Sequence, residues 1–293
     1  MNTFRQRLIH LHDCPYVSRK LLRAWLKKDP SLSYLPNISP KEIAASLQLS
    51  HETARSIYNH IHDSTIMKKL DINEQIYNCV TYFDEAYPAL LKIIPDPPLV
   101  LYTRGDMTLL HHPLTLSVVG TRTPSKYAFP AMEQILLPLI QSNFCIVSGM
   151  AVGVDQHAHR LALQHKGSTI AVMGSGFEHL YPRNNPALFT HLCERQLVIS
   201  EYPPSRPPRK FHFPERNRII SGLSEATLVI EARLKSGSLI TVDQALEQGR
   251  EVLSLPGPIG SKTSEGCHAI IKEGARLIQS HQDVLSAYRE KFN

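Results

Sequence analysis

The chain has 293 residues, of which 42% are hydrophobic and 20% are charged. These proportions are ordinary for a globular protein, and the length suits one large domain with a small second one. No uninterrupted apolar stretch approaches the ~20 residues needed to cross a bilayer, and the first residues lack the apolar core of a secretion signal. We therefore expect a cytoplasmic protein without membrane insertion.

The positive charge is concentrated in one part of the chain. Lysine and arginine number 32 against 26 acidic residues, a formal net charge of +6. Residues 203–218 (PPSRPPRKFHFPERNR), called here the basic segment, carry five basic residues against only Glu215. An anionic partner is compatible with this excess. The five cysteines are scattered without a C-x-x-C pair, so we expect neither disulfides nor a zinc site.

Residues 1–72 are predicted to form a small all-helical domain of the SAM-like or helix-hairpin-helix-like kind. Ser39, Pro40 and Glu42 have the spacing of a helix capping box with proline in the first turn, and Ser50 can cap the next helix. Residues 73–114 follow as a lead-in arm. Within them, the segment 87–106 carries four prolines and ends in an extended apolar run, which argues against a helix.

From residue 115 to residue 293 the pattern predicts an extended Rossmann-like α/β domain. The apolar runs are SVVG, FCIVS, TIAVM, QLVIS, ATLVIEA and EVLSL. Most are followed by a glycine- or proline-bearing turn and a helical stretch. Consecutive apolar residues suit strands covered on both faces, and repeated strand-turn-helix units indicate a doubly wound, mostly parallel sheet.

In such a sheet the turns after the strands meet at one edge, where ligands bind. Glycine, serine and arginine recur in these turns, for example in GTRTPSK (120–126) and SGMAVGVD (148–155). A glycine such as Gly120 also suits any tight turn, and Arg122 could be merely solvated. The alternative for Arg122 is a bidentate grip on a phosphate.

Several kinds of site are disfavoured because their motifs are absent. Neither G-x-G-x-x-G nor GxxxxGK[ST] follows the first parallel strand, and no G-x-S-x-G turn surrounds Ser148. A metal-dependent nuclease would need clustered carboxylates, which this edge lacks. Asp155 is better explained as a first-turn acid with His159 as its structural partner than as a metal ligand. We expect no cofactor, no metal and no catalytic residue.

The basic segment favours single-stranded nucleic acid. Arg209 and Lys210 alternate with Phe211, His212 and Phe213. Exposed bases stack on aromatic rings at about 1–3 kcal/mol each, while cations follow the phosphates. The alternative is that one of the two phenylalanines packs into the core.

The motifs resemble those of the DNA-processing protein A family, also called DprA or Smf. The match spans roughly residues 80–285 and rests on an ordered set of motifs: GTR (120–122), SGMAVGVDQHAH (148–159), GSGFEHLYPRNN (174–185), SEYPP (200–204), FHFPERNRIISGLS (211–224) and EARLKSGSLITVDQALEQGREVLSLPGPI (231–259).

This resemblance implies a bacterial mediator, not an enzyme, that binds and protects incoming single-stranded DNA and loads RecA onto it in natural transformation and recombination. It also implies a homodimer formed through the Rossmann domain, and it points to the single-strand-binding protein as a further partner. The DNA-binding residues that it implies are Gly120, Thr121, Arg122, Ser148, Gly149, Gly153, Lys210, Phe213, Arg216, Asn217 and Arg218.

The chain departs from the family pattern at a few positions. Thr121 stands where serine is commoner, and Val152 stands where members often carry a basic residue, which bears on affinity. We expect no C-terminal winged-helix domain. The alternative function is a nucleoside-monophosphate N-glycosidic hydrolase of a related Rossmann group. Those enzymes look like P-G-G-x-G-T-x-x-E at the corresponding turn, and here Gln244 takes the place of the final glutamate.

Overall fold

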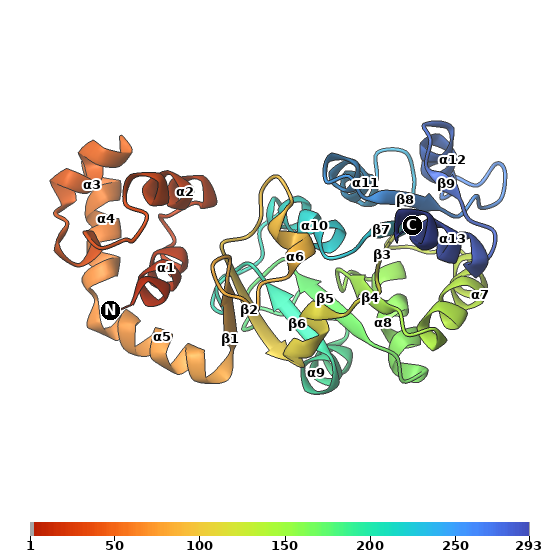
Figure 1. Ribbon diagram of the computed structural model, residues 1–293, viewed down its shortest axis with the longest axis horizontal. Coiled ribbons are helices and arrows are strands. Elements are labelled where there is room, and N and C mark those ends of the chain that lie inside the picture. The colour runs from red at the N-terminus through yellow and green to blue at the C-terminus, as the bar shows by residue number, and fades with distance from the viewer. Residues whose placement is uncertain (1–2, 293) are drawn as a thin grey trace.

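The computed structural model describes residues 3–292. Helices α1–α5 gather at one end of the molecule, and α5 leads into an α/β domain that contains the C-terminal helix (Figure 1). The N-terminal elements are α1 (Phe4–Asp13), α2 (Arg19–Lys28), the 3-10 turn η1 (Leu35–Asn37), α3 (Pro40–Leu47), α4 (His51–His62) and α5 (Ser64–Ile76).

Local capping explains where these helices begin. The Ser39 side chain accepts from the backbone N–H of Glu42, and the Glu42 carboxylate accepts from the Ser39 N–H, which confirms the predicted capping box. Ser50 caps α4 as expected. Helix α5 was not predicted. It begins after Asp63, whose carboxylate accepts from the Thr65 N–H.

A single nine-stranded sheet organises the rest of the chain, in the order β1-β2-β6-β5-β4-β3-β7-β8-β9. Its strands are β1 (Asn78–Thr81), β2 (Val100–Gly105), β3 (Thr115–Val119), β4 (Cys145–Ser148), β5 (Thr169–Met173), β6 (Leu197–Ser200), β7 (Ala226–Val229), β8 (Glu251–Ser254) and β9 (Arg276–Leu277). Strands β3–β8 are the six predicted runs and pair in parallel, so the predicted sheet is confirmed.

The segment 73–114 is more than an arm. It supplies β1 and β2, which pair antiparallel with each other and extend the sheet beyond β6. It also holds the 3-10 helix η2 (Met107–His111) and the short helix α6 (Ala89–Lys92), and because α6 lies within 87–106, the expectation of no helix there is wrong. The domain boundaries stay a proposal, with the addition that the sheet starts at Asn78.

Helices cover both faces of the sheet. They are α7 (Ala128–Gln141), α8 (Val154–Gln164), α9 (Pro186–Arg195), α10 (His212–Gly222), α11 (Gly237–Glu247), α12 (Glu265–Lys272) and α13 (His281–Phe292). One apolar cluster joins α7, α8 and α13 to the sheet, and another joins α6, α10, α11 and α12 to its opposite face. Successive strand residues alternate between these clusters because side chains alternate across a sheet.

The helical part is joined to the sheet by shared burial. A third cluster combines Trp25 of α2 with Tyr102 of β2 and Phe177 after β5. The His12 ring also lies 3.3 Å from the Tyr102 hydroxyl. Contacts of this kind fix the position of the helical part against the edge of the sheet. Among residues 3–292, no helix has both the length and the apolar character needed to cross a membrane.

Candidate nucleic-acid interface

The candidate site lies where the strand order reverses. Strand β3 pairs with β4 on one side and with β7 on the other, so the helices that follow neighbouring strands diverge from this point. Crevices at the carboxyl ends of strands form at such reversals in open α/β sheets. The turn after β3 starts at Gly120, which puts the first predicted motif at this crevice.

The turn at 120–122 exposes one cation. The Thr121 N–H donates to the Glu231 carbonyl at 2.8 Å, and the Thr121 hydroxyl accepts from the Thr123 N–H at 3.2 Å. Arg122 is exposed, and its guanidinium has no hydrogen-bond or ion-pair partner among residues 3–292. The threonine that replaces serine therefore organises the turn, while Arg122 is free to meet an anion.

The turn between β4 and α8, residues 149–153 and called here the second turn, packs directly on the first turn at 120–122. Gly153 has φ +90°, and a β-carbon placed there would lie 2.5 Å from the Thr121 carbonyl oxygen. Only glycine adopts this conformation at so short a distance without strain. Ser148 is fully buried, and its hydroxyl donates to the Val118 carbonyl at 2.7 Å. Ser148 thus joins two strands, and its hydroxyl is occupied by this bond.

Asp155 holds the second turn in shape. Its Oδ2 accepts from the N–H groups of Gly149 and Ala151, each at 3.2 Å, which confirms its expected place in the first turn of α8. The predicted pairing with His159 is wrong. The hydrogen-bond partner of His159 Nδ1 is instead the Thr169 hydroxyl, at 2.7 Å. Burial raises the pKa of Asp155 to about 6, with nearby Arg216 opposing the shift.

This raised pKa gives a testable pH dependence. Because the folded state retains the Asp155 proton that the unfolded chain releases near pH 4, the stability contributed by the neutral carboxyl is present at low pH. It is lost as the pH rises through about 6. We expect the free energy of unfolding of the wild type, minus that of Asp155→Asn, to fall over this window.

Urea denaturation at a series of pH values measures this difference. Asp243→Asn, a change at an exposed carboxylate of α11, controls for the loss of one negative charge. A difference between wild type and Asp155→Asn that is flat or rises with pH would contradict the assignment.

Arg216 lies beneath the second turn and is buried. Its Nη1 donates to the Gly149 carbonyl at 2.5 Å and also to the Val172 carbonyl. Burial lowers its pKa to about 10, with Asp155 opposing the shift, so the guanidinium stays charged at neutral pH. Arg216 thus connects α10 to the ends of β4 and β5.

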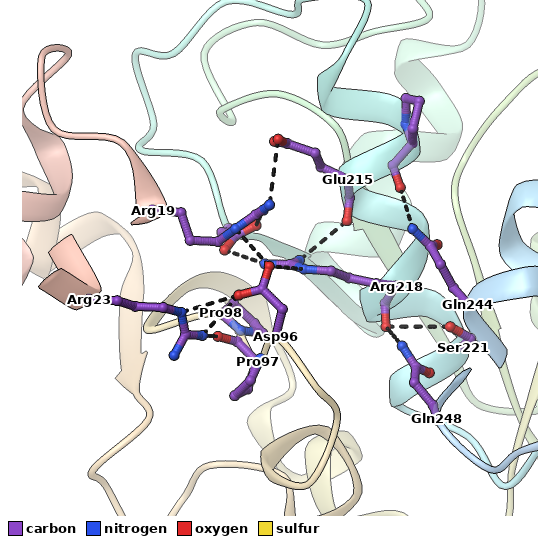
Figure 2. Close-up of polar contacts among 12 residues, drawn as sticks. Arg19, Arg23, Asp96, Pro97, Pro98, Glu215, Arg218, Ser221, Gln244 and Gln248 are labelled. Atoms are coloured by element: carbon purple, nitrogen blue, oxygen red, sulfur yellow. Dashed lines mark hydrogen bonds and ion pairs between the residues drawn. The ribbon is translucent and has the colours of Figure 1, made fainter. Parts of the chain in front are cut away.

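Arg218 is also withdrawn from the crevice. It is 6% exposed, and its Nη2 donates to the Glu201 carboxylate at 2.7 Å. Figure 2 shows Arg218 beside Asp96, which α2 approaches from the other side. Asn217 is partly exposed, and its amide donates to the Gly237 carbonyl at the start of α11. Of the three predicted residues 216–218, only Asn217 reaches the open edge.

A pocket of about 440 Å³ lies at this edge, lined by Val152, Tyr181, Arg183 and Pro208 among others. Lys210 is exposed, with no partner for its ammonium among the described residues. The half-buried Phe213 ring lies over Gly174, and its centroid is 5.1 Å from that of Tyr181. The predicted phosphate and base contacts Arg122, Lys210 and Phe213 are therefore all accessible.

Sequence reasoning missed several residues at this edge. Tyr181 is 43% exposed, and Arg183 is exposed two positions later. Arg233 and Lys235 are exposed after β7, with no side-chain partners among residues 3–292. All four lie in turns that the strand pattern already placed at the edge. The sequence pattern that could have identified them is an aromatic or cationic residue in a turn that follows a strand.

Glu231 and Gln244, the carboxylate and the amide that could suggest catalysis at this edge, both form hydrogen bonds within the protein. The buried Glu231 carboxylate accepts from the Ser125 N–H at 2.9 Å and from the hydroxyls of Ser125 and Thr263. Gln244, the position where the alternative hydrolase has glutamate, donates its amide to the Pro214 carbonyl at 3.0 Å. An ionised glutamate has no N–H for this bond. Within residues 3–292, no group of three metal-ligating side chains occurs.

A family model for DNA recombination-mediator protein A matches residues 78–289, which is most of the chain. The chain belongs to this family. The DNA processing protein DprA of Bacillus subtilis is 38% identical over 275 residues, which cover 94% of this chain and 92% of that protein. The family match includes β1 and β2 and so agrees with a sheet that starts near Asn78.

Two solved DprA structures extend the comparison. The X-ray structure of DprA from Streptococcus pneumoniae has a TM-score of 0.85 at 36% identity and covers 98% of both chains. DprA from Helicobacter pylori, whose structure concerns a single-stranded DNA binding mode, has a TM-score of 0.65 at 29% identity. It covers 73% of this chain and 97% of its own. The match to the pneumococcal protein includes the helical part as well as the sheet.

Proposed function

We propose that this protein is a recombination mediator that binds single-stranded DNA at the carboxyl edge of its sheet, protects incoming strands and loads RecA onto them during natural transformation. Its working place is the cytoplasm, and it acts without a catalytic step or a cofactor. The observation that carries the proposal is that the side chains of Arg122, Lys210 and Phe213 are open at this edge, with Phe213 in contact with Tyr181 of the pocket.

The chemistry of these side chains supports a single strand over a duplex. Unstacked bases offer ring faces to Phe213 and Tyr181, whereas bases in a duplex are stacked on one another. Arg122 and Lys210 supply charge for phosphates. Single-stranded DNA binding by the Helicobacter pylori relative is consistent with this proposal.

Within this proposal the predicted residues divide into two roles. Arg122, Lys210 and Phe213 meet the strand. Asn217 has part of each role, because its side chain is partly exposed while its amide is hydrogen-bonded to Gly237 and Arg216. The remaining predicted residues shape the two turns and α10, namely Gly120, Thr121, Ser148, Gly149, Gly153, Arg216 and Arg218. We assign these to positioning because their polar groups are engaged within the protein or because they are glycines in close contact with it.

Replacing Arg122 with alanine should weaken binding of single strands of different sequence about equally. The side chain meets phosphate, not base, so the slope of log affinity against log salt should flatten by about 0.7, the value for one phosphate on a single strand. Fluorescence anisotropy at several salt concentrations measures both quantities. Arg195→Ala, at the end of α9, is the matched control. An unchanged affinity and slope in Arg122→Ala would remove Arg122 from the interface.

The proposed function itself is tested with a labelled strand of ~20 nucleotides and its duplex. Tight, salt-sensitive preference for the single strand supports it. RecA loading is then tested by strand exchange on DNA coated with single-strand-binding protein, where this protein should remove the delay that the coat imposes. Absence of binding would redirect the assay to hydrolysis of nucleoside monophosphates. Sedimentation tests the proposed homodimer through the Rossmann domain.

A further inference from the structure

A second cleft lies on the other side of the basic segment, between it and the helical part of the chain. It has a volume of about 370 Å³. One wall is formed by the end of α1, the loop to α2 and the first turn of α2, and the other by the end of β6 and the basic segment. The residues used below are Tyr16, Arg19, Lys20, Arg206, Arg209 and Phe211. We call it the interdomain cleft. Its lining shares no residue with that of the pocket that contains Tyr181, so the two hollows are distinct.

Two exposed aromatic side chains lie in this cleft, one from each wall. Tyr16 is 53% exposed and Phe211 is 54% exposed. The Phe211 ring is held in place edge-on against His212, at 4.7 Å between centroids, and His212 stacks on Tyr202 at 3.9 Å. Exposed aromatic surface contributes little to the core. A fixed ring with an open face is the platform on which a flat aromatic ligand stacks.

The charge of the cleft is positive. Lys20 and Arg209 are exposed, with no side-chain partner among residues 3–292. The two acidic residues of the lining are already paired. The Glu201 carboxylate accepts from Arg218, and Glu215 lies 3.5 Å from Arg19. The cleft therefore presents cations to an incoming anion, while its carboxylates are compensated from within the protein.

An ion network keeps the two walls in position. Arg19 Nε lies 2.8 Å from the Asp96 carboxylate, and Arg23 lies 3.1 Å from the same carboxylate (Figure 2). On the basic segment, Arg206 Nη2 donates to the Asp13 carbonyl at 2.9 Å. These bonds run from the helical part to the α/β domain on both sides of the cleft. The cleft is thus formed before any ligand arrives.

We propose that the interdomain cleft is a second subsite for the same single strand, in which a nucleobase stacks on Tyr16 or Phe211 and Lys20 and Arg209 hold neighbouring phosphates. This inference rests on the proposed function. Phe211 directly follows Lys210 in the chain. A DNA strand bound at the first interface therefore reaches the interdomain cleft by crossing the basic segment. The helical part then acts as one wall of the DNA path.

The test compares strands of two lengths by fluorescence anisotropy. Tyr16→Ala should weaken binding of a ~25-nucleotide oligothymidylate by about 5- to 150-fold, the range measured for the loss of one stacked base. It should leave a ~5-nucleotide strand unaffected, since that strand fills only the first interface. Tyr34→Ala is the matched control, because Tyr34 is 71% exposed in the helical part and does not line the cleft. Melting temperatures verify that both variants fold.

Stacking is read separately with 2-aminopurine placed at successive positions of the longer strand. The wild type should quench the 2-aminopurine fluorescence at one position of the strand where Tyr16→Ala no longer quenches it. Equal affinities and equal quenching for Tyr16→Ala, Phe211→Ala and Tyr34→Ala would overturn the proposal and leave an acidic peptide as the occupant to test. Failure of the proposed function is distinct, since the wild type would then bind neither strand. Arg122→Ala should weaken both lengths.

Discussion

Replacing Arg216 with glutamine should lower the free energy of unfolding by about 3–5 kcal/mol, the usual cost of leaving a buried charge uncompensated. The change removes the donor to the carbonyls of Gly149 and Val172, and it leaves the buried Asp155 carboxylate without its neighbouring positive charge. Urea denaturation measures the loss. The deficit should be smaller at pH 5 than at pH 8, because a protonated Asp155 needs no counter-charge.

Arg209→Gln is the matched control for this experiment. It makes the same change at an exposed guanidinium of the basic segment and should stay within about 0.5 kcal/mol of the wild type. DNA binding by Arg216→Gln should be reduced only to the extent that the second turn is disordered. An Arg216→Gln protein as stable as the wild type but unable to bind the strand would instead place Arg216 in contact with DNA.

Adding one methyl group at Gly153 should cost about 3 kcal/mol or more, since a positive φ and an overpacked contact each contribute about 1–3 kcal/mol. The added β-carbon would lie 2.5 Å from the Thr121 carbonyl oxygen and 2.8 Å from the Arg122 carbonyl. Both contacts are with backbone, so no side chain can rotate away to relieve them. Displacement of the first turn should also weaken single-strand binding through Arg122.

Gly237→Ala provides the control for Gly153→Ala. It makes the same change in the unfolded chain, but a β-carbon at Gly237 meets no atom within 4 Å. Its free energy of unfolding should stay within about 0.5 kcal/mol of the wild type. Equal stability of the two alanine variants would mean that the two turns separate readily, against the close contact in the structure.

Strand and helix positions were predictable because their signals are local. Strands β3–β8 are short runs of consecutive apolar residues, which is the pattern of strands buried on both faces. The Ser39–Glu42 capping box needs only four adjacent residues. Helix α5 escaped prediction. Strands β1 and β2 lie in a proline-rich segment and pair antiparallel, outside the repeating strand-turn-helix pattern.

The composition of the interface was also partly predictable. Parallel strands carry their following turns to one edge, so Arg122 and Lys210 could be assigned to it before the fold was known. The degree of burial of each arginine could not be predicted from the sequence. Arg209, Arg216 and Arg218 lie within ten residues, yet the first is exposed and the other two are buried. The difference depends on the partners of the buried pair, namely the carbonyls of Gly149 and Val172 and the carboxylate of Glu201, which come from other parts of the chain.

The sequence by itself determined the six parallel strands, the edge at which ligands meet the sheet and the chemistry gathered there, because these follow from periodicity and from neighbours in the chain. The tertiary structure alone decided which cations stay open and which hold the protein together. It also decided that Tyr16 and Phe211 share one cleft, since they are brought together by packing between segments far apart in sequence. No local pattern encodes a contact of that kind.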